Sequence, residues 1–341
     1  AALGDAEAAE DDPTALGEVL ATPIAGIWEC LAPGRRLRLA SEAATRAQRA
    51  GARQVELRAR WLRLFELLAA GELLLFDAEL AEITRWTEES ADDLERYGVA
   101  CLHIARAVLA GRLEEAERLA SEAFLMSRRH DDRSALDLYG TQLIAIRAEQ
   151  GRLDELVEPT AAAAAQTTAV SPRCLLAWIH ARRRDAPAAR AVLAEVERRD
   201  LPRLADAPIA AANAGVLAEV ASFLGDAALA SRVAMLLEPE RGRVLLRGVT
   251  AVHGPADFFR GHAAAAQGRT QDAAQAFAEA AALAERLEAP LWAAAARKAQ
   301  AALDPPRRTG GFAGPPAALR GPASSPVPPP VSAPSAGSRR S

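Results

Sequence analysis

A short motif recurs along this chain of 341 residues and restricts its fold more than any other feature. In each copy an apolar segment ends at a glycine, one or two polar residues follow, and an alanine-rich amphipathic segment begins. The copies centre on Gly34, Gly71, Gly111, Gly151, Gly225 and Gly268, and a seventh copy has Arg184 in place of glycine. The intervals between copies are 37, 40, 40, 33, 41 and 43 residues. Because two helices of about 15 residues with two short turns fill such an interval, the motif predicts stacked helix pairs.

Composition and local pattern agree with helices. Half of the residues are apolar, mostly Ala and Leu, and aromatic residues make up only 4%, whereas strands favour aromatic and β-branched side chains. Glycine suits the turn between two helices because the left-handed conformation at a helix C-cap costs it little. The helical period is clearest where Leu113, Ala116, Leu119, Ala120 and Ala123 form one apolar stripe. We therefore predict an all-α fold, an α-solenoid of six to seven antiparallel helix pairs.

The composition also suggests domain boundaries. Residues 14–304 are predicted to form the helical-repeat domain, with Leu16–Cys30 and Leu291–Leu303 as its terminal helical segments. Residues 1–13 are acidic and are expected to fray. Residues 305–341 consist almost entirely of Pro, Gly, Ala, Ser and Arg, so this tail is expected to be disordered.

Charge and cysteine content restrict the partners and the compartment. The net charge is −4, and five arginines but no acidic residue follow Asp304, so the preceding part carries −9. Such an acidic domain is not expected to bind nucleic acid directly. Cys30, Cys101 and Cys174 lack metal-ligand or paired spacing. No segment is apolar enough for a membrane span. We therefore expect a cytoplasmic protein without metal sites.

One repeat carries a recognisable family pattern. Around the turn at Gly268, small residues and an aromatic residue occur at Gly261, Ala273, Phe277 and Ala280, an arrangement that resembles a tetratricopeptide repeat (TPR). More broadly, the strings YGTQLIAIRAEQGRLDEL, EVASFLGDAALASRVAMLLEP and FFRGHAAAAQGRTQDAAQAFAEAAAL resemble the C-terminal helical region of large bacterial signalling ATPases of the STAND type. The resemblance implies an array that senses a protein, peptide or small ligand. It also implies an upstream ATPase domain with a nucleotide-cyclase or helix-turn-helix effector in the same polypeptide.

The sequence offers no catalytic or cofactor-binding motif. The single lysine, Lys298, lies in a helical segment without the glycine-rich loop of a phosphate-binding site, and the five histidines show no metal-ligand spacing. We therefore expect no enzymatic activity, cofactor or metal in this segment. Because the chain begins at Ala1, we expect either a removed initiator or the C-terminal part of a longer protein. The alternatives are a free-standing TPR adaptor and, less favoured, an all-helical enzyme such as an α/α-toroid hydrolase.

Candidate binding residues come from the repeat register, because the first helix of each TPR pair lines the concave face. Counting back ten and six residues from each turn residue gives Trp61 and Phe65, Cys101 and Ala105, Thr141 and Ala145, Cys174 and Trp178, Gly215 and Glu219, and Phe258 and His262. The candidate groove residues are Arg58, Trp61, Phe65, Trp178, Arg182, Phe258 and His262. Aromatic side chains at several levels suit a groove for a peptide or an apolar ligand, and the arginines supply charge. The competing interpretation is that these aromatics pack between helices.

Overall fold

The computed structural model describes residues 33–88, 92–128, 132–207, 209–247 and 251–303, all within one compact unit. The expectations of a frayed residue 1–13 segment, a helix over Leu16–Cys30 and a disordered tail over residues 305–341 concern residues outside these ranges. The described residues are overwhelmingly helical, which confirms the predicted fold class.

Fourteen α-helices lie within the described ranges. They are α4 (Pro33–Ala50), α5 (Arg53–Ala70), α6 (Leu73–Glu88), α7 (Asp93–Leu109), α8 (Leu113–Ser127), α9 (Asp132–Glu149), α10 (Asp154–Gln166), α11 (Ser171–Arg182), α12 (Ala186–Arg199), α13 (Ala210–Leu224), α14 (Ala227–Leu237), α15 (Ala256–Ala266), α16 (Thr270–Arg286) and α17 (Pro290–Ala301). Two short 3-10 helices, η2 (Leu201–Arg203) and η3 (Glu238–Glu240), follow α12 and α14. We call α5, α7, α9, α11, α13 and α15, the first helix of each pair, the inner helices.

The predicted turn residues reverse the chain between paired helices. Gly71, Gly111, Gly151, Gly225 and Gly268 all have positive φ angles, and so does Arg184, the substitute in the degenerate copy. At Gly71, the amide donates to the carbonyl of Leu68, and the next amide, of Glu72, donates to that of Leu67. These bonds satisfy carbonyls that the end of a helix leaves unpaired. The turn motif is thus confirmed at six of its seven positions.

The prediction at Gly34 is wrong. Gly34 lies in the first turn of α4, which begins at Pro33, and the chain reverses instead at Gly51, where φ is +66°. Proline is well placed at the start of a helix because its φ is already helical and its missing N–H has no partner there. The string Pro33–Gly34 is therefore the start of a helix and not a turn between two helices.

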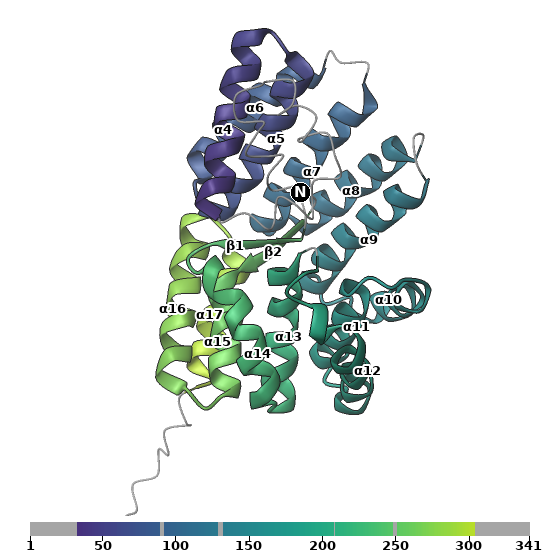
Figure 1. Cartoon of the computed structure of the whole chain (residues 1–341), viewed down its shortest axis with the longest axis vertical. Coiled ribbons are helices and arrows are strands. Elements are labelled where there is room, and N and C mark those ends of the chain that lie inside the picture. The colour runs from purple at the N-terminus through teal and green to yellow at the C-terminus, as the bar shows by residue number, and fades with distance from the viewer. Residues whose placement is uncertain (1–32, 89–91, 129–131, 208, 248–250, 304–341) are drawn as a thin grey trace, which may run out of the picture. The chain divides into compact units, whose positions relative to one another are not determined.

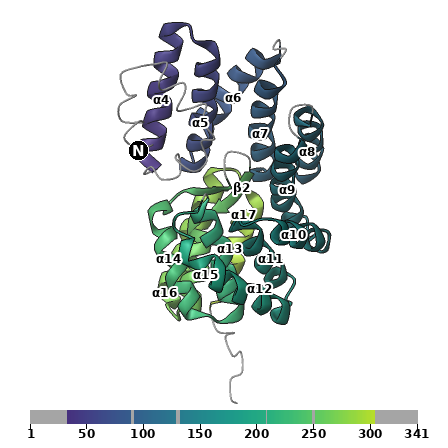
Figure 2. The ribbon, with the colours of Figure 1, turned by 45° about the vertical axis from the view of Figure 1, so that its right-hand side comes forward.

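A β-hairpin interrupts the repeats between α14 and α15, which the sequence analysis did not predict. Strand β1 (Val244–Arg247) pairs antiparallel with β2 (Ala251–Pro255). The hairpin packs against the inner helices α5, α7, α9, α13 and α15. In Figures 1 and 2 it lies in the middle of the helices, between the purple and blue N-terminal ones and the green C-terminal ones. It accounts for the 43-residue interval from Gly225 to Gly268, the longest of the six.

The last helices contact the first repeats. Helix α17 packs on α7, and Arg106 of α7 donates to Glu288, which precedes α17, at 2.8 Å. At two repeat turns the approach is close, because a Cβ added to Gly71 would lie 2.9 Å from Leu283 and one added to Gly111 would lie 3.4 Å from Leu291. One apolar core runs continuously from α5 to α17. The repeats therefore form a closed arrangement within the described residues.

Candidate binding site on the inner helices

Three neighbouring inner helices bring four predicted or register-derived residues together. Trp178 on α11, Glu219 on α13 and His262 on α15 each lie six residues before a turn residue, so they occupy the same level. The indole N–H of Trp178 donates to Glu219 Oε1 at 2.9 Å. Arg182 donates to both oxygens of Glu219, at 2.9 and 3.2 Å, and its guanidinium lies 4.9 Å from the centre of the Trp178 ring. Glu219 thus connects two candidate groove residues.

The charged side chains of Glu219 and Arg182 are largely buried, but solvent still reaches both of them. The side chain of Glu219 is 11% exposed and that of Arg182 is 25% exposed. Burial alone would raise the pKa of Glu219, but Arg182, His262 and the donated hydrogen bonds lower it below its ordinary value. Burial lowers the pKa of His262, and the charge of Glu219 offsets this only in part. Glu219 is therefore an anion held by a charge-assisted network.

Glu149, the last residue of α9, is the poorly paired member of this group. Its Oε1 lies 4.0 Å from Arg182 Nη1, which is too long for a hydrogen bond, and no other described residue bonds to it. Burial raises the pKa of Glu149 and the nearby charge of Glu219 raises it further, while Arg182 opposes both effects. Its side chain is only 16% exposed. A largely desolvated carboxylate without a hydrogen bond from the protein is unfavourable for folding, which makes Glu149 a candidate for binding.

His253 completes the site from the hairpin. Leu245 pairs with Gly254 and Leu246 pairs with Val252, so His253 is the extra residue of a β-bulge. Its ring stacks on Phe259 at 4.9 Å, it is 7% exposed, and its Nε2 has no hydrogen-bond partner in the described structure. Bulges redirect a side chain out of the regular alternation of a strand. Burial, with the positive charges of Arg247 and Arg182, holds the pKa of His253 well below its ordinary value.

Glu149, Trp178 and His253 line one small cavity. Its volume is about 20 Å³, enough for one water-sized group. Its remaining lining residues come from α7, α9, the hairpin and α17, and they are Val108, Thr141, Ile144, Ala145, Ala148, Arg247, Ala251, Val252 and Trp292. Glu149, which lacks a hydrogen bond, and His253, which has an unpaired ring nitrogen, therefore line the same space. We call Glu149, Trp178, Arg182, Glu219, His253 and His262 the inner-face cluster.

The other predicted groove residues lie elsewhere. Phe258 is buried in an aromatic group with Phe259, Phe277 and Trp292, although its ring also contacts His262 at 4.7 Å. In the same repeat, a Cβ on Gly261 would lie 2.6 Å from the Phe277 ring, which explains the small residue of the TPR-like pattern.

A second aromatic pair lies on α5. Trp61 packs edge-on against the buried Phe65 and donates its indole N–H to the carbonyl of Gly98 at 2.8 Å. Arg58 is exposed and makes no ion pair with the described residues. These three residues therefore do not join the inner-face cluster.

Sequence reasoning missed Glu149 and His253. Glu149 lies two residues before the turn glycine, one helical turn beyond the positions that were counted. His253 lies in a segment with a strand-like composition, because VLLR and AVHGP flank Gly-Val-Thr. Two features of the sequence could have indicated the hairpin: the long interval from Gly225 to Gly268 and the β-branched residues within it.

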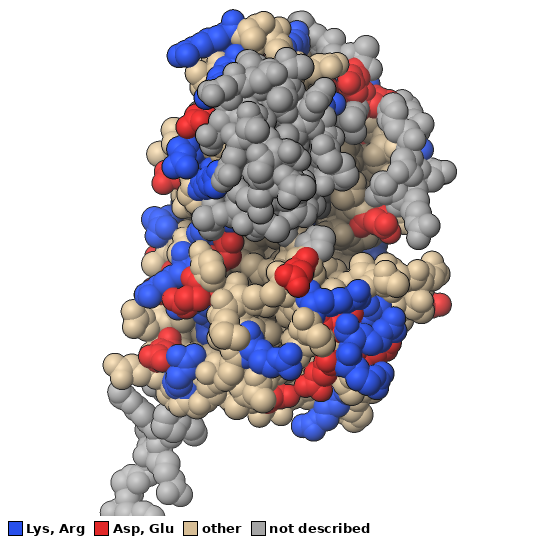
Figure 3. Space-filling model, viewed as in Figure 1, with Lys and Arg blue, Asp and Glu red and all other residues tan. Residues whose placement is uncertain are grey.

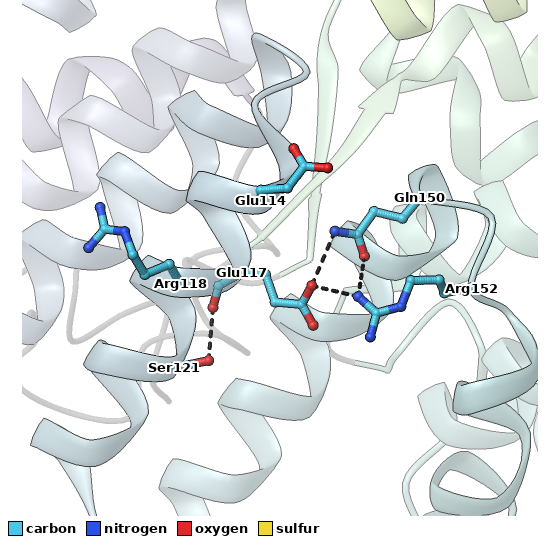
Figure 4. Close-up of a pocket in the computed structure, with 6 residues that line it drawn as sticks. All are labelled: Glu114, Glu117, Arg118, Ser121, Gln150 and Arg152. Atoms are coloured by element: carbon cyan, nitrogen blue, oxygen red, sulfur yellow. Dashed lines mark hydrogen bonds and ion pairs between the residues drawn. The ribbon is translucent and has the colours of Figure 1, made fainter.

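A larger hollow on the described surface is a less promising site. It has a volume of about 590 Å³ and is lined by Glu114, Glu117, Arg118, Ser121, Gln150 and Arg152. Figure 4 shows that Glu117 of α8 points toward the turn after α9, where it accepts hydrogen bonds from Gln150 at 3.1 Å and Arg152 at 2.7 Å. Arg152 also donates to Glu155. These charges neutralise one another, so the network joins two repeats and offers little to a ligand.

Two further features of the described residues are the mixture of charges on one face and the composition of their acidic, histidine and cysteine clusters. Arginines gather over α11 and α12 in Figure 3, but acidic side chains lie among them, so this face lacks a field of one sign. Within the described ranges, no group of three or more His, Cys, Asp or Glu side chains could hold a metal ion. None of the described helices combines the length and hydropathy needed to cross a bilayer.

Comparisons of this chain with protein-family models, with curated proteins and with solved structures find no match.

Proposed function

We propose that this chain is a protein-interaction and sensor module that binds a peptide or small ligand at the inner-face cluster. In this proposal it is the C-terminal part of a bacterial ATP-dependent signalling or transcription regulator. Ligand binding would shift the packing of the repeats and thereby change their contacts with an upstream ATPase domain. The larger assembly rests on the resemblance to STAND-type ATPases given above.

Glu149 is the observation that carries the binding role. A carboxylate that is desolvated without hydrogen bonds lowers the stability of the fold, and such groups concentrate at functional sites. It lines the cavity together with the unpaired His253 nitrogen, and it lies beside Arg182, which solvent reaches. A ligand group that donates to Glu149 would replace the missing hydrogen bond.

The first test is to determine the coding sequence upstream of the Ala1 codon. An in-frame extension with the GxxxxGK[ST] loop of an ATPase and a cyclase or helix-turn-helix domain is the expected result. A start codon directly before Ala1, preceded by a stop codon, would contradict the signalling-ATPase proposal and favour the free-standing adaptor.

The second test uses the whole polypeptide. We expect E149Q to change the basal ATPase rate by roughly fivefold or more, the range of typical allosteric coupling energies. E155Q is the matched control, because Glu155 is a more exposed carboxylate of the next helix and pairs with Arg152. Equal rates for the wild type and E149Q would contradict a regulatory role of the inner-face cluster.

A further inference from the structure

The hairpin lies where the groove of a helical-repeat protein would hold its ligand. It enters from η3 and leaves into α15, so it belongs to the junction of the last two repeats. Yet β1 packs on α5, and β2 packs on α7 and α9, the inner helices of the first three repeats. A segment from one end of the array therefore covers the inner face of the other end (Figures 1 and 2).

Polar contacts hold the base of the hairpin to the first helices. Arg243 donates to Glu66 of α5 at 2.7 Å, across 177 positions of sequence. Arg36 of α4 donates to Glu240 at 2.9 Å and lies 3.4 Å from Glu66. Arg243 also pairs with Glu240 at 3.2 Å. Two arginines and two glutamates thus form a ring that closes the hairpin onto α4 and α5.

The strands supply an apolar and arginine-bearing surface to the inner helices. Val244, Leu245 and Val252 are almost fully buried. Arg247 at the end of β1 donates to the side-chain oxygen of Asn213 at 3.1 Å and to the carbonyl of Ala212 at 3.3 Å. The inner face therefore accepts a strand with apolar side chains and one arginine.

The packing of the hairpin on the inner helices is incomplete near the bulge at His253. His253 Nε2 has no partner among the described residues, Glu149 lies 4.0 Å from Arg182, beyond hydrogen-bond distance, and residues of α9 and β2 line the cavity of about 20 Å³. Buried polar groups are ordinarily satisfied, and leaving them unpaired costs free energy. The hairpin thus fills the inner face but leaves the carboxylate of Glu149 without a hydrogen bond from the described residues.

We propose that the inner face of α5, α7, α9 and α13 is a groove for a strand-forming peptide, that the hairpin occupies it in cis, and that a partner segment with the same apolar and arginine pattern displaces the hairpin. This proposal rests on the proposed function, because it names the chemistry of the peptide that the sensor recognises. Displacement would break the ring around Glu66 and free η3 and the start of α15.

Hydrogen exchange of the full chain tests whether the hairpin opens by itself. We expect amides of residues 244–247 and 251–254 to exchange at least about tenfold faster than the slowest amides of α13, because local opening requires less free energy than global unfolding. R243Q should accelerate hairpin exchange by about tenfold or more, since it removes a charged partner of the buried Glu66. R241Q is the matched control, because Arg241 pairs with the surface residue Glu279. Hairpin amides that exchange only as slowly as α13 would overturn the proposal.

Binding in trans tests the groove directly. The probe is a fluorescent synthetic peptide with the sequence of residues 242–256, and the receptor is the full chain with residues 244–255 replaced by glycine and serine. We expect binding to this variant, at least tenfold weaker binding to the intact chain, and weaker binding of the peptide with Arg247→Ala. A variant that lacks cooperative unfolding, or a folded variant that does not bind the peptide, would overturn the proposal. Either failure would leave the ATPase test with E149Q unaffected, so the two proposals fail separately.

Discussion

Gly254 of the hairpin lies against the indole of Trp292: a Cβ added to this glycine would lie 2.6 Å from the Cη2 and Cζ2 atoms of the ring and 2.7 Å from its Cζ3 atom. The glycine also has a φ of +118°, a conformation that other residues rarely adopt. The contact joins the strand that carries His253 to the last described helix. The position thus combines a steric and a conformational requirement for glycine.

Replacing this glycine should be strongly destabilising. For Gly254→Ala we expect a loss of about 1–2 kcal/mol from the backbone conformation and a further 1–3 kcal/mol from overlap with the ring. Gly242→Ala is the control, because Gly242 has a φ of +73° and no atom lies within 4 Å of its added Cβ. Chemical denaturation of both variants measures the difference. Equal losses would show that Trp292 moves aside without cost.

Arg173 is the second position where we predict a large effect on folding. It donates to both carboxylate oxygens of Asp200, at 2.6 and 2.8 Å, and both side chains are buried. It also donates to the carbonyls of Ala164, Thr167, Thr168 and Ala169. Arg173→Met should lower the free energy of unfolding by about 3–5 kcal/mol. The variant would leave the buried carboxylate of Asp200 without its main positively charged partner.

The control for this prediction is Arg183→Met. Arg183 pairs with Asp154, whose side chain is 84% exposed, and exposed pairs contribute about 1 kcal/mol or less. Urea unfolding of the two variants provides the comparison. Similar losses at both positions would mean that the buried pair is no more important than the surface pair.

Glu149→Gln should stabilise the isolated chain. The raised pKa of Glu149 means that its charged form is disfavoured in the folded state. Glutamine removes the charge and keeps the shape, so we expect a gain of about 0.5–1 kcal/mol at pH 7. The wild type should gain part of this stability as the pH falls toward the unfolded pKa of 4.5, because the folded state then binds the additional proton. A loss of stability in the variant at pH 7 would indicate that the carboxylate is well paired.

His253 should make the chain sensitive to mild acid. Its folded pKa lies well below the ordinary value of 6.5, so the unfolded state binds a proton at a higher pH than the folded state does. Stability is therefore retained above pH 6.5 and falls as the pH drops below it, by up to about 1.4 kcal/mol per pH unit for one group.

The variant His253→Phe isolates this contribution. Phenylalanine can keep the stack on Phe259 but cannot bind a proton, so the decline between pH 6.5 and 5 should be shallower than in the wild type. Thermal unfolding at several pH values measures both slopes. Parallel curves for the two proteins would assign the acid sensitivity to other groups.

The repeat turns were predictable because their chemistry is local. A residue with positive φ must follow each first helix, and glycine accepts this conformation readily, so Gly71 and Gly268 mark the turns in the sequence alone. Arg184 shows that the register persists where the glycine is lost. The prediction of a turn at Gly34 was wrong because a proline followed by a glycine fits the start of a helix as well as a turn.

The candidate site was predictable only in part, because it depends on contacts between distant segments. Register counting placed Trp178, Glu219 and His262 at one level, since neighbouring inner helices present equivalent positions side by side. It could not show that His253 would join them, because a short hairpin must cross to distant helices to bring it there. Register counting also grouped Trp61 with Trp178. In the structure, Trp61 donates to the carbonyl of Gly98, whereas Trp178 donates to Glu219.

The contact between α17 and α7 has a consequence for how the chain folds. In an open array each repeat touches only its neighbours, so terminal repeats can unfold first and the stability is nearly a sum over repeats. Here the pairing of Arg106 with Glu288 spans 182 positions, and the hairpin adds further long-range contacts. Such contacts raise the contact order and slow folding, and they couple both ends of the array into one cooperative transition. Removing the last helix pair should thus destabilise helices near Arg106 as much as those beside the cut.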